Sequence, residues 1–195
     1  MNAVPTNTLL LGLILLLLVG GAIAWIVVQR QRTNRLQRRF GTEYGRTIKE
    51  FGSRAKAEKE LAKREDRVSG LRIVALSPAE AARFSKAWNV LQGRFVDNPK
   101  GVVAEADRLV RDLMVKRGYP MGDFELRAAD ISVDHPAVVS NYRAAQAIAV
   151  RDAHGEADTE ELRKAVVHYR TLFDELLEVT PAPDAATPAR VAVQS

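Results

Sequence analysis

The segment that most constrains this chain is an uncharged apolar run near its first residue. Residues 9–28 read LLLGLILLLLVGGAIAWIVV, twenty positions without a charged side chain. A helix rises about 1.5 Å per residue, so a run of this length spans the roughly 30 Å hydrocarbon core of a bilayer. A helix also satisfies its own backbone hydrogen bonds, which lipid cannot do. The run therefore predicts one transmembrane helix.

The charges on either side of the run predict its orientation. Residues 1–8 carry no charged side chain, whereas arginines crowd the segment that follows the run. Arginine-rich flanks stay on the cytoplasmic side of a membrane. We expect residues 1–8 to form a short extracytoplasmic N-terminus and the chain after the run to be cytoplasmic. The arginines that we expect to contact lipid headgroups are Arg30, Arg32, Arg35, Arg38 and Arg39.

A cleaved signal peptide is the alternative interpretation of this run. Ala22-Ile23-Ala24 resembles the small-residue site at which such peptides are cleaved. Secretory signals normally begin with a positively charged region, which this chain lacks before residue 9. The apolar run also continues beyond that site to Val28. Both observations favour an uncleaved anchor.

The net charge of +5 is unevenly distributed. Residues 29–70 hold 13 Lys and Arg against 6 Asp and Glu, whereas residues 71–179 hold 15 against 17. A basic segment beside a membrane helix suits anionic lipid headgroups. Nucleic-acid binding requires a basic face on the folded domain, so we expect no nucleic-acid partner. The chain has no cysteine, which excludes disulfides, Cys-ligated zinc and thiol catalysis.

The rest of the chain predicts helices. Apolar residues recur at steps of three and four between Leu36 and Phe51, and a charged helical pattern continues to Gly70, so we expect residues 29–70 to form a basic juxtamembrane stalk. The apolar stripe of this stalk needs cover from lipid, from a second copy or from the C-terminal domain, and a homo-oligomer is therefore possible. Residues 71–76 predict an extended connector. The tail at 180–195 is rich in Pro and Ala and is expected to be disordered.

Between residues 77 and 179, helix-start signals predict a small bundle of four main helices. Ser77 and Asp158 each precede a Glu by three residues, which is the pattern of a capping box. Asp134 is expected to cap a third helix from His135, and residues 123–129 to form one or two turns. The predicted fold is thus all-α: a transmembrane helix (9–28), the stalk and a cytoplasmic helical domain (71–179). We expect one buried cluster to contain Trp88, Phe95, Leu109, Tyr142, Tyr169 and Phe173.

No motif of known chemistry is present, and the histidines lack the spacing of a metal site. We therefore expect no catalytic residue, metal or cofactor. The residues that could instead bind a ligand are Arg94, Asp97, Asp134, His135, Arg143 and Arg170. One alternative is a small-molecule or phosphate-binding module that uses Arg94, Arg143 or Arg170. A weaker alternative is a hydrolase-like enzyme that uses Asp130, Asp134 and His135.

Four segments carry a family resemblance: WNVLQGRFVDNPKGVVAEADRLV, RGYP, SVDHP and TEELRKAVVHYRTLF. They resemble an uncharacterised family of small bacterial single-pass membrane-anchored proteins, over about residues 40–178. Such sequences often have a second Asp after Asp97, where this chain has Asn98. The resemblance implies a bacterial source and the same single-anchor layout, and it supplies no catalytic residues.

These observations predict a non-enzymatic protein of the bacterial inner membrane, with a single anchor and a cytoplasmic helical interaction domain. The expected partners are the lipid bilayer, through its anionic headgroups, and a protein that the sequence does not identify.

Overall fold

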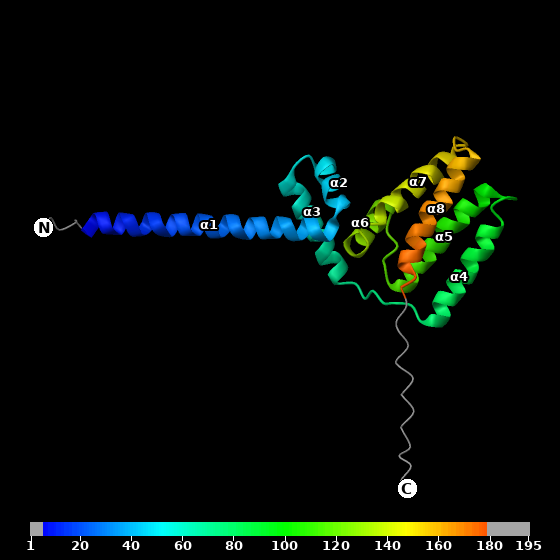
Figure 1. Ribbon diagram of the computed structural model, residues 1–195, viewed down its shortest axis with the longest axis horizontal. Helices are drawn as coiled ribbons and strands as arrows, with labels where there is room; N and C mark the ends of the chain where they lie inside the picture. The colour runs from blue at the N-terminus through cyan, green and yellow to red at the C-terminus, as the bar shows by residue number, and fades with distance from the viewer. Residues whose placement is uncertain (1–5, 179–195) are drawn as a thin grey trace, which may run out of the picture. The chain divides into compact units, whose positions relative to one another are not determined.

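The computed structural model describes residues 6–178, with side chains from Leu15 onward, and the expected disordered tail lies outside these residues. Within them the chain is helical and forms no strand, which confirms the all-α prediction (Figure 1). The helices are α1 (Thr6–Phe40), α2 (Thr42–Phe51), α3 (Arg54–Ser69), α4 (Pro78–Gly93), α5 (Pro99–Arg117), α6 (Phe124–Asp134), α7 (Val139–Ala153) and α8 (Thr159–Leu176).

The chain packs as two compact units, Met1–Ala62 and Lys63–Ser195. The division falls within α3, earlier than the boundary after residue 70 that the composition suggested. The first unit contains α1, α2 and the start of α3. The second contains the end of α3 and the helices α4 to α8.

The helix α1 continues without interruption from the apolar run into the arginine-rich segment. It is long and apolar enough to cross a membrane, and its apolar side chains from Leu15 to Val28 are exposed rather than packed in a protein core. The length and the apolar composition of α1 confirm the prediction of one helix long enough to span a membrane.

Two glycines divide the expected stalk into separate helices. Gly41 and Gly52 have φ values of +49° and +70°, which side chains disfavour and glycine tolerates. The apolar stripe is consequently shared between α1 and α2. Leu36, Phe40 and Tyr44 are buried together with Ala57 and Leu61 of α3, so α3 of the same unit covers most of the stripe.

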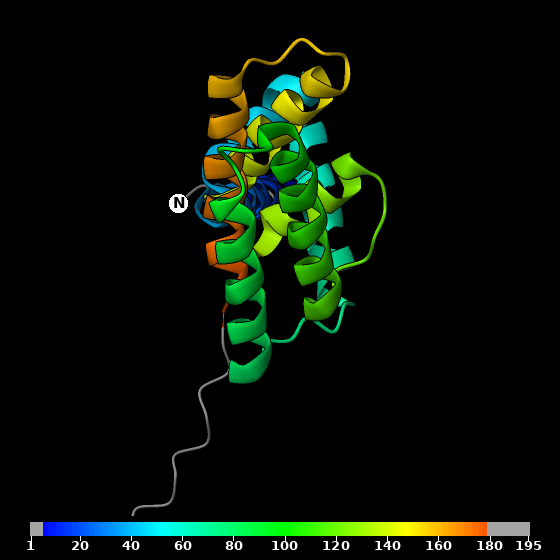
Figure 2. The ribbon, with the colours of Figure 1, turned by 90° about the vertical axis from the view of Figure 1, so that its right-hand side faces the viewer.

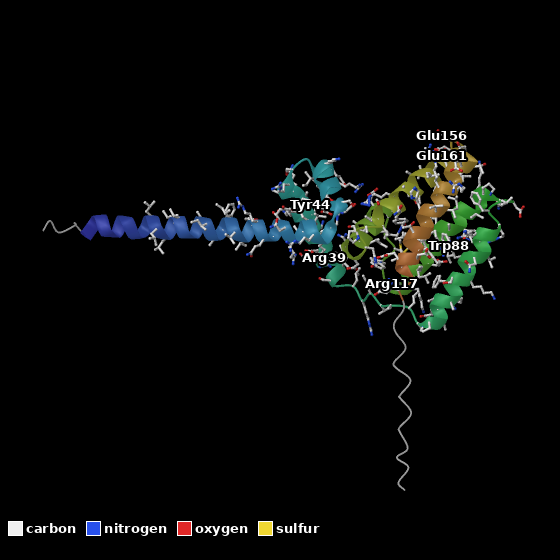
Figure 3. The ribbon with its side chains drawn as sticks, in the orientation of Figure 1. Arg39, Tyr44, Trp88, Arg117, Glu156 and Glu161 are labelled. Atoms are coloured by element: carbon white, nitrogen blue, oxygen red, sulfur yellow. The ribbon has the colours of Figure 1, made fainter. Side chains whose placement is uncertain are left out.

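A single carboxylate fastens α3 to the other two helices. Glu58 Oε1 accepts hydrogen bonds of 2.8 Å from Thr33 Oγ1 on α1 and from Tyr44 Oη on α2. Burial and this carboxylate together raise the pKa of Tyr44, which is labelled in Figure 3. The start of α3 is therefore held beside the part of α1 that follows the apolar run.

In the second unit, α8 is the central helix, and both α5 and α7 pack along it (Figure 1). α4 packs on α5, and α6 on α7 (Figure 2). The Trp88 ring stacks on Phe173 at a centroid distance of 4.7 Å, and Tyr142 and Tyr169 are fully buried nearby in the same cluster.

The expected core was wrong at two of its six positions, since Phe95 and Leu109 are only partly buried. Phe95 follows the end of α4 at Gly93 and so lies outside its regular face. Leu109 lies at the open side of the contact between α4 and α5.

Local signals set most of the helix ends in this unit. Ser77 with Glu80 and Asp158 with Glu161 form the two predicted capping boxes. Gly118 ends α5 with a φ of +96°, and a Cβ there would lie 2.3 Å from the carbonyl oxygen of Arg72. Glycine therefore permits the close approach of the connector 71–76 to the end of α5, where Val74 N donates to the carbonyl oxygen of Arg117 at 2.9 Å.

The expected boundary between α6 and α7 was wrong. Asp134 is the last residue of α6 rather than a cap, His135 follows as the C-cap, and α7 starts only at Val139. A residue before proline is disfavoured in the helical region, and His135, which precedes Pro136, has φ −127° and ψ 54°. The interval 123–134 is therefore a true helix, capped by Asp123, and the domain has five helices after residue 77.

Replacing Trp88 by Ala should strongly destabilise the second unit. Its side chain is 1% exposed, and loss of a buried large aromatic typically costs about 3–5 kcal/mol of unfolding free energy. The thermal midpoint of the full-length protein in detergent, followed by circular dichroism, measures the effect. Trp25→Ala is the matched control, because Trp25 is 65% exposed and should leave the midpoint unchanged. An equal effect of both substitutions would contradict the assigned core.

Candidate functional site

A groove lies between α4 and α5 and encloses about 520 Å³; we call it the α4–α5 groove. Its apolar lining consists of Ala87, Val90, Leu91 and Leu109. Its charged lining consists of Arg83, Lys86, Arg94, Arg108, Glu105 and Asp112. The cations outnumber the carboxylates, although residues 71–179 as a whole carry a small acidic excess.

The helix register explains why these residues share one surface. On α4, Arg83, Ala87, Val90 and Arg94 recur at steps of three and four, which places them on one face. Glu105, Leu109 and Asp112 do the same on α5. The capping box at Ser77 and the cap at Asn98 fix where each helix starts and hence which residues face the groove.

Ion pairs join the two helices at both ends of the groove. Lys116 pairs with Glu80 near the start of α4, and Arg94 pairs with Glu105 near its end. The hydrogen bond from Lys116, together with those from Ser77, lowers the pKa of Glu80 to about 2. Both carboxylates are therefore engaged within the protein.

Three other cations of the groove have no such partner. Arg83, Lys86 and Arg108 form no ion pair with any carboxylate that the structure describes, and all three are exposed. Val90 lines the same groove and is 56% exposed. The groove thus combines an apolar floor with a net positive charge, because its four cations outnumber its two carboxylates, Glu105 and Asp112.

A second cavity of about 530 Å³ is polar and lies where α5, α6 and α8 end; we call it the polar pocket. Arg117 is its most buried cation. Its guanidinium donates to the carbonyl oxygens of Val74 (3.1 Å) and Leu176 (3.3 Å) and to the carboxylate of Glu178 (2.8 Å). Figure 3 labels Arg117 near this junction.

The other polar groups of this pocket are also paired inside the chain. Tyr119 Oη donates to Asp134 at 3.2 Å, and burial, reinforced by Asp134, raises the pKa of Tyr119. His135 Nδ1 lies 3.1 Å from Glu175 Oε1. Because each group has a partner, the pocket serves first to join α5, α6 and α8.

The polar pocket contains Asp134 and His135, two of the sequence-predicted residues. Asp130, their expected companion, does not line it. Asp130 is fully buried and binds Arg67, with Nη2 at 2.6 Å from Oδ1. Sequence reasoning missed Arg117, Tyr119, Glu175 and Glu178, although RGYP at 117–120 and SVDHP at 132–136 meet here.

The three candidate arginines lie in different surroundings. Arg94 lines the α4–α5 groove, whereas neither Arg143 nor Arg170 lines either cavity. Arg170 pairs with Asp174 and lies 5.7 Å from the centre of the Trp88 ring. Arg143 lies on α7 with a partly buried side chain. Asp97 is exposed beyond the end of α4.

The remaining histidines have structural partners. His154 caps α7 and lies 2.8 Å from the carbonyl oxygen of Val150, and His168 lies 2.8 Å from Asn141 Oδ1. Within the described part of the chain, no group of three or more His, Asp or Glu side chains is arranged to hold a metal ion.

The five arginines predicted to contact lipid are all exposed on α1. Arg35, Arg38 and Arg39 line a pocket of about 550 Å³ with Gln31 and Asn34. Arg30 instead lines a larger groove between α1 and α3. Arg32 lines neither of these two.

The geometry defines the class of protein: an all-α chain with one helix able to span a membrane and a helical domain that carries a basic groove. Comparisons with protein-family models, curated proteins and solved structures find no match to the chain.

Replacing Arg117 by Gln should destabilise the second unit by about 3–5 kcal/mol, because the buried guanidinium satisfies two carbonyl groups and a carboxylate. The free energy of unfolding in urea measures the effect. Arg163→Gln is the control, since the pair of Arg163 with Glu160 is exposed to solvent and should contribute little to the free energy of unfolding. Equal stabilities of the two variants would show that Arg117 does not join the helix ends.

Proposed function

We propose that this protein is a membrane-anchored interaction protein. Its α1 helix spans the bacterial inner membrane with the chain after Arg30 in the cytoplasm, and its helical domain binds an acidic amphipathic helix of a partner protein. The observation that carries the second part is the α4–α5 groove, where an apolar floor lies among cations that outnumber the carboxylates. The membrane part rests on the length and composition of α1 and on the arginines that follow the apolar run.

An amphipathic helix matches both chemical features of the groove. Binding between two helices lets the apolar face of a peptide cover Val90, Leu91 and Leu109. Carboxylates beside that face would compensate Arg83, Lys86 and Arg108 and would speed association electrostatically. The groove volume of about 520 Å³ fits a few anchoring side chains rather than a whole domain.

The alternative functions have less support. An enzyme or a phosphate-binding module needs several reactive or charged groups that converge on one cavity. Asp134 and His135 share the polar pocket but are engaged by Tyr119 and Glu175, and Asp130 binds Arg67 elsewhere. The carboxylates of that pocket also make it a poor site for phosphate.

The basic segment after the apolar run supports an attachment to anionic lipid. Five arginines lie on the part of α1 that follows the apolar run, and each basic residue near an anionic surface contributes roughly 1 kcal/mol of binding. The family resemblance in the sequence supports a bacterial source and a single anchor.

A reporter fused to the C-terminus should reveal a cytoplasmic location. The arginines after the apolar run should keep the rest of the chain on the cytoplasmic side of the membrane. A fluorescent protein that folds only in the cytoplasm should therefore be bright in bacterial cells. A phosphatase that is active only in the periplasm, fused at the same residue, should be inactive. The reverse pattern would overturn the proposed orientation.

Site-specific photo-crosslinking should identify a partner at the groove. A photoreactive amino acid in place of Val90 should form a crosslink in cells, because Val90 is 56% exposed inside the groove. The same replacement of Val167 is the matched control. Val167 is 52% exposed on α8 and does not line the groove, so it should not form this product.

Charge reversal in the α4–α5 groove should test whether the crosslinked partner is acidic. Lys86→Glu with Arg108→Glu should reduce the Val90 crosslink by about tenfold or more, since two attractive charges become repulsive. Arg72→Glu with Lys164→Glu removes the same residue types from exposed positions outside the groove and should leave the product intact. A product equally sensitive to both pairs, or one that contains two copies of this chain, would overturn the proposed partner.

A further inference from the structure

A groove between α1 and α3 begins where the apolar run of α1 ends, and it encloses about 790 Å³. We call it the α1–α3 groove. From α1 it is lined by Trp25, Ile26, Gln29, Arg30, Thr33, Asn34 and Gln37, and from α3 by Arg54, Ala55 and Glu58. Its volume lies within the range of small-ligand sites, roughly 300–1,000 Å³.

The lining changes from apolar to polar along α1. Trp25 and Ile26 are exposed apolar side chains, and the polar residues start one turn later at Gln29 and Arg30. The headgroup layer of a bilayer extends about 5–8 Å beyond the hydrocarbon core. At about 1.5 Å per residue, Gln29 to Thr33 occupy this layer when Val28 marks the end of the core. This depth rests on the proposed membrane insertion of α1.

Two cations face this groove from different helices. Arg30 on α1 and Arg54 on α3 are exposed, and neither forms an ion pair within residues 6–178. A guanidinium binds phosphate through two parallel hydrogen bonds. Arg54 reaches this position only because α3 is fastened beside α1, so the groove is a product of the fold and not of α1 alone.

The one carboxylate in the groove is already engaged. Glu58 Oε1 accepts hydrogen bonds from Thr33 and Tyr44, which hold this carboxylate against the protein. The groove therefore retains a net positive charge. The amides of Gln29, Asn34 and Gln37 add exposed donors for hydroxyl or phosphate oxygens.

We propose that the α1–α3 groove binds the headgroup of one anionic phospholipid, with the phosphate between Arg30 and Arg54 and the acyl chains along Trp25 and Ile26. A headgroup with a single negative phosphate and a neutral polar substituent matches the net charge and the amides of the groove. A choline headgroup adds a cation that Arg30 and Arg54 repel. The groove should therefore bind one anionic phospholipid molecule specifically, in addition to the lipids that the basic segment attracts by charge alone.

Quenching of Trp25 fluorescence by brominated lipids tests this site in the full-length protein. Trp88, the other tryptophan, is 1% exposed in the core and is shielded from lipid. Vesicles contain equal amounts of phosphatidylglycerol and phosphatidylcholine, with bromine on the acyl chains of one lipid at a time. Brominated phosphatidylglycerol should quench at least about threefold more strongly, because the local attraction enriches it beside Trp25.

Two double variants separate the groove from general surface charge. Arg30→Gln with Arg54→Gln should equalise the quenching by the two lipids. Arg32→Gln with Lys56→Gln removes the same number of charges from exposed positions of the same two helices outside the groove. This control variant lowers the general attraction to anionic lipid by the same amount. It should nevertheless preserve most of the stronger quenching by brominated phosphatidylglycerol. Equal loss in both variants, or equal quenching of the unaltered protein by both lipids, would overturn the site.

The failure of the site and the failure of the proposed function give different results. Quenching by neither lipid would contradict membrane insertion and hence the proposed function, whereas equal quenching by both contradicts only the site. Soluble glycerophosphate should not reduce the preference, since it lacks the acyl chains that place a headgroup at Trp25. Its competition with the lipid at millimolar concentration would show that the groove binds phosphate itself and not a phospholipid.

Discussion

The helical domain depends on one buried guanidinium, that of Arg117. It lies at the end of α5 and donates to the connector, to the last turn of α8 and to Glu178. Backbone carbonyls at such ends lack helical partners, and a charged donor is a strong way to satisfy them in a buried place. Tyr119, two residues later, extends the same junction to the end of α6. The helix ends that determine the bundle are thus joined by polar contacts, whereas its middle is joined by the aromatic cluster.

Features that depend on neighbouring residues could be predicted from the sequence. The capping boxes at Ser77 and Asp158, the glycine end of α5 and the membrane-length helix are local, and the structure confirms each of them. The α6–α7 boundary is local too, but it depended on the effect of Pro136 on His135, which competed with the capping propensity of Asp134. The capping propensity of Asp134 predicted a helix start at His135, but the steric effect of Pro136 on His135 keeps that residue out of a helix.

Features that join distant segments could not be predicted. The partners of Arg117 lie 43 to 61 residues away, so no spacing in the sequence points to them. The α4–α5 groove could have been suspected from the recurrence of Arg83, Lys86 and Arg94 along one helix face. Which of those cations would find carboxylates depends on the register of α5, because Arg94 meets Glu105 and the other two meet none. Arg54 lines the same groove as Arg30 only because the chain turns at Gly52 and α3 packs back beside α1. The sequence suggested a continuous stalk instead.

The central position of α8 has a consequence for biosynthesis. α5 and α7 pack mainly on α8, and Trp88 stacks on Phe173, yet α8 is the last helix of the domain to be translated. At about 5–20 residues per second, α4 waits on the order of ten seconds after leaving the ribosome before Phe173 follows it. During that time the apolar faces of α5 and α7 lack their main packing partner, and Trp88 of α4 lacks the ring on which it stacks. The core of the domain is therefore completed only after α8 has been synthesised, and the earlier helices stay incompletely packed until then.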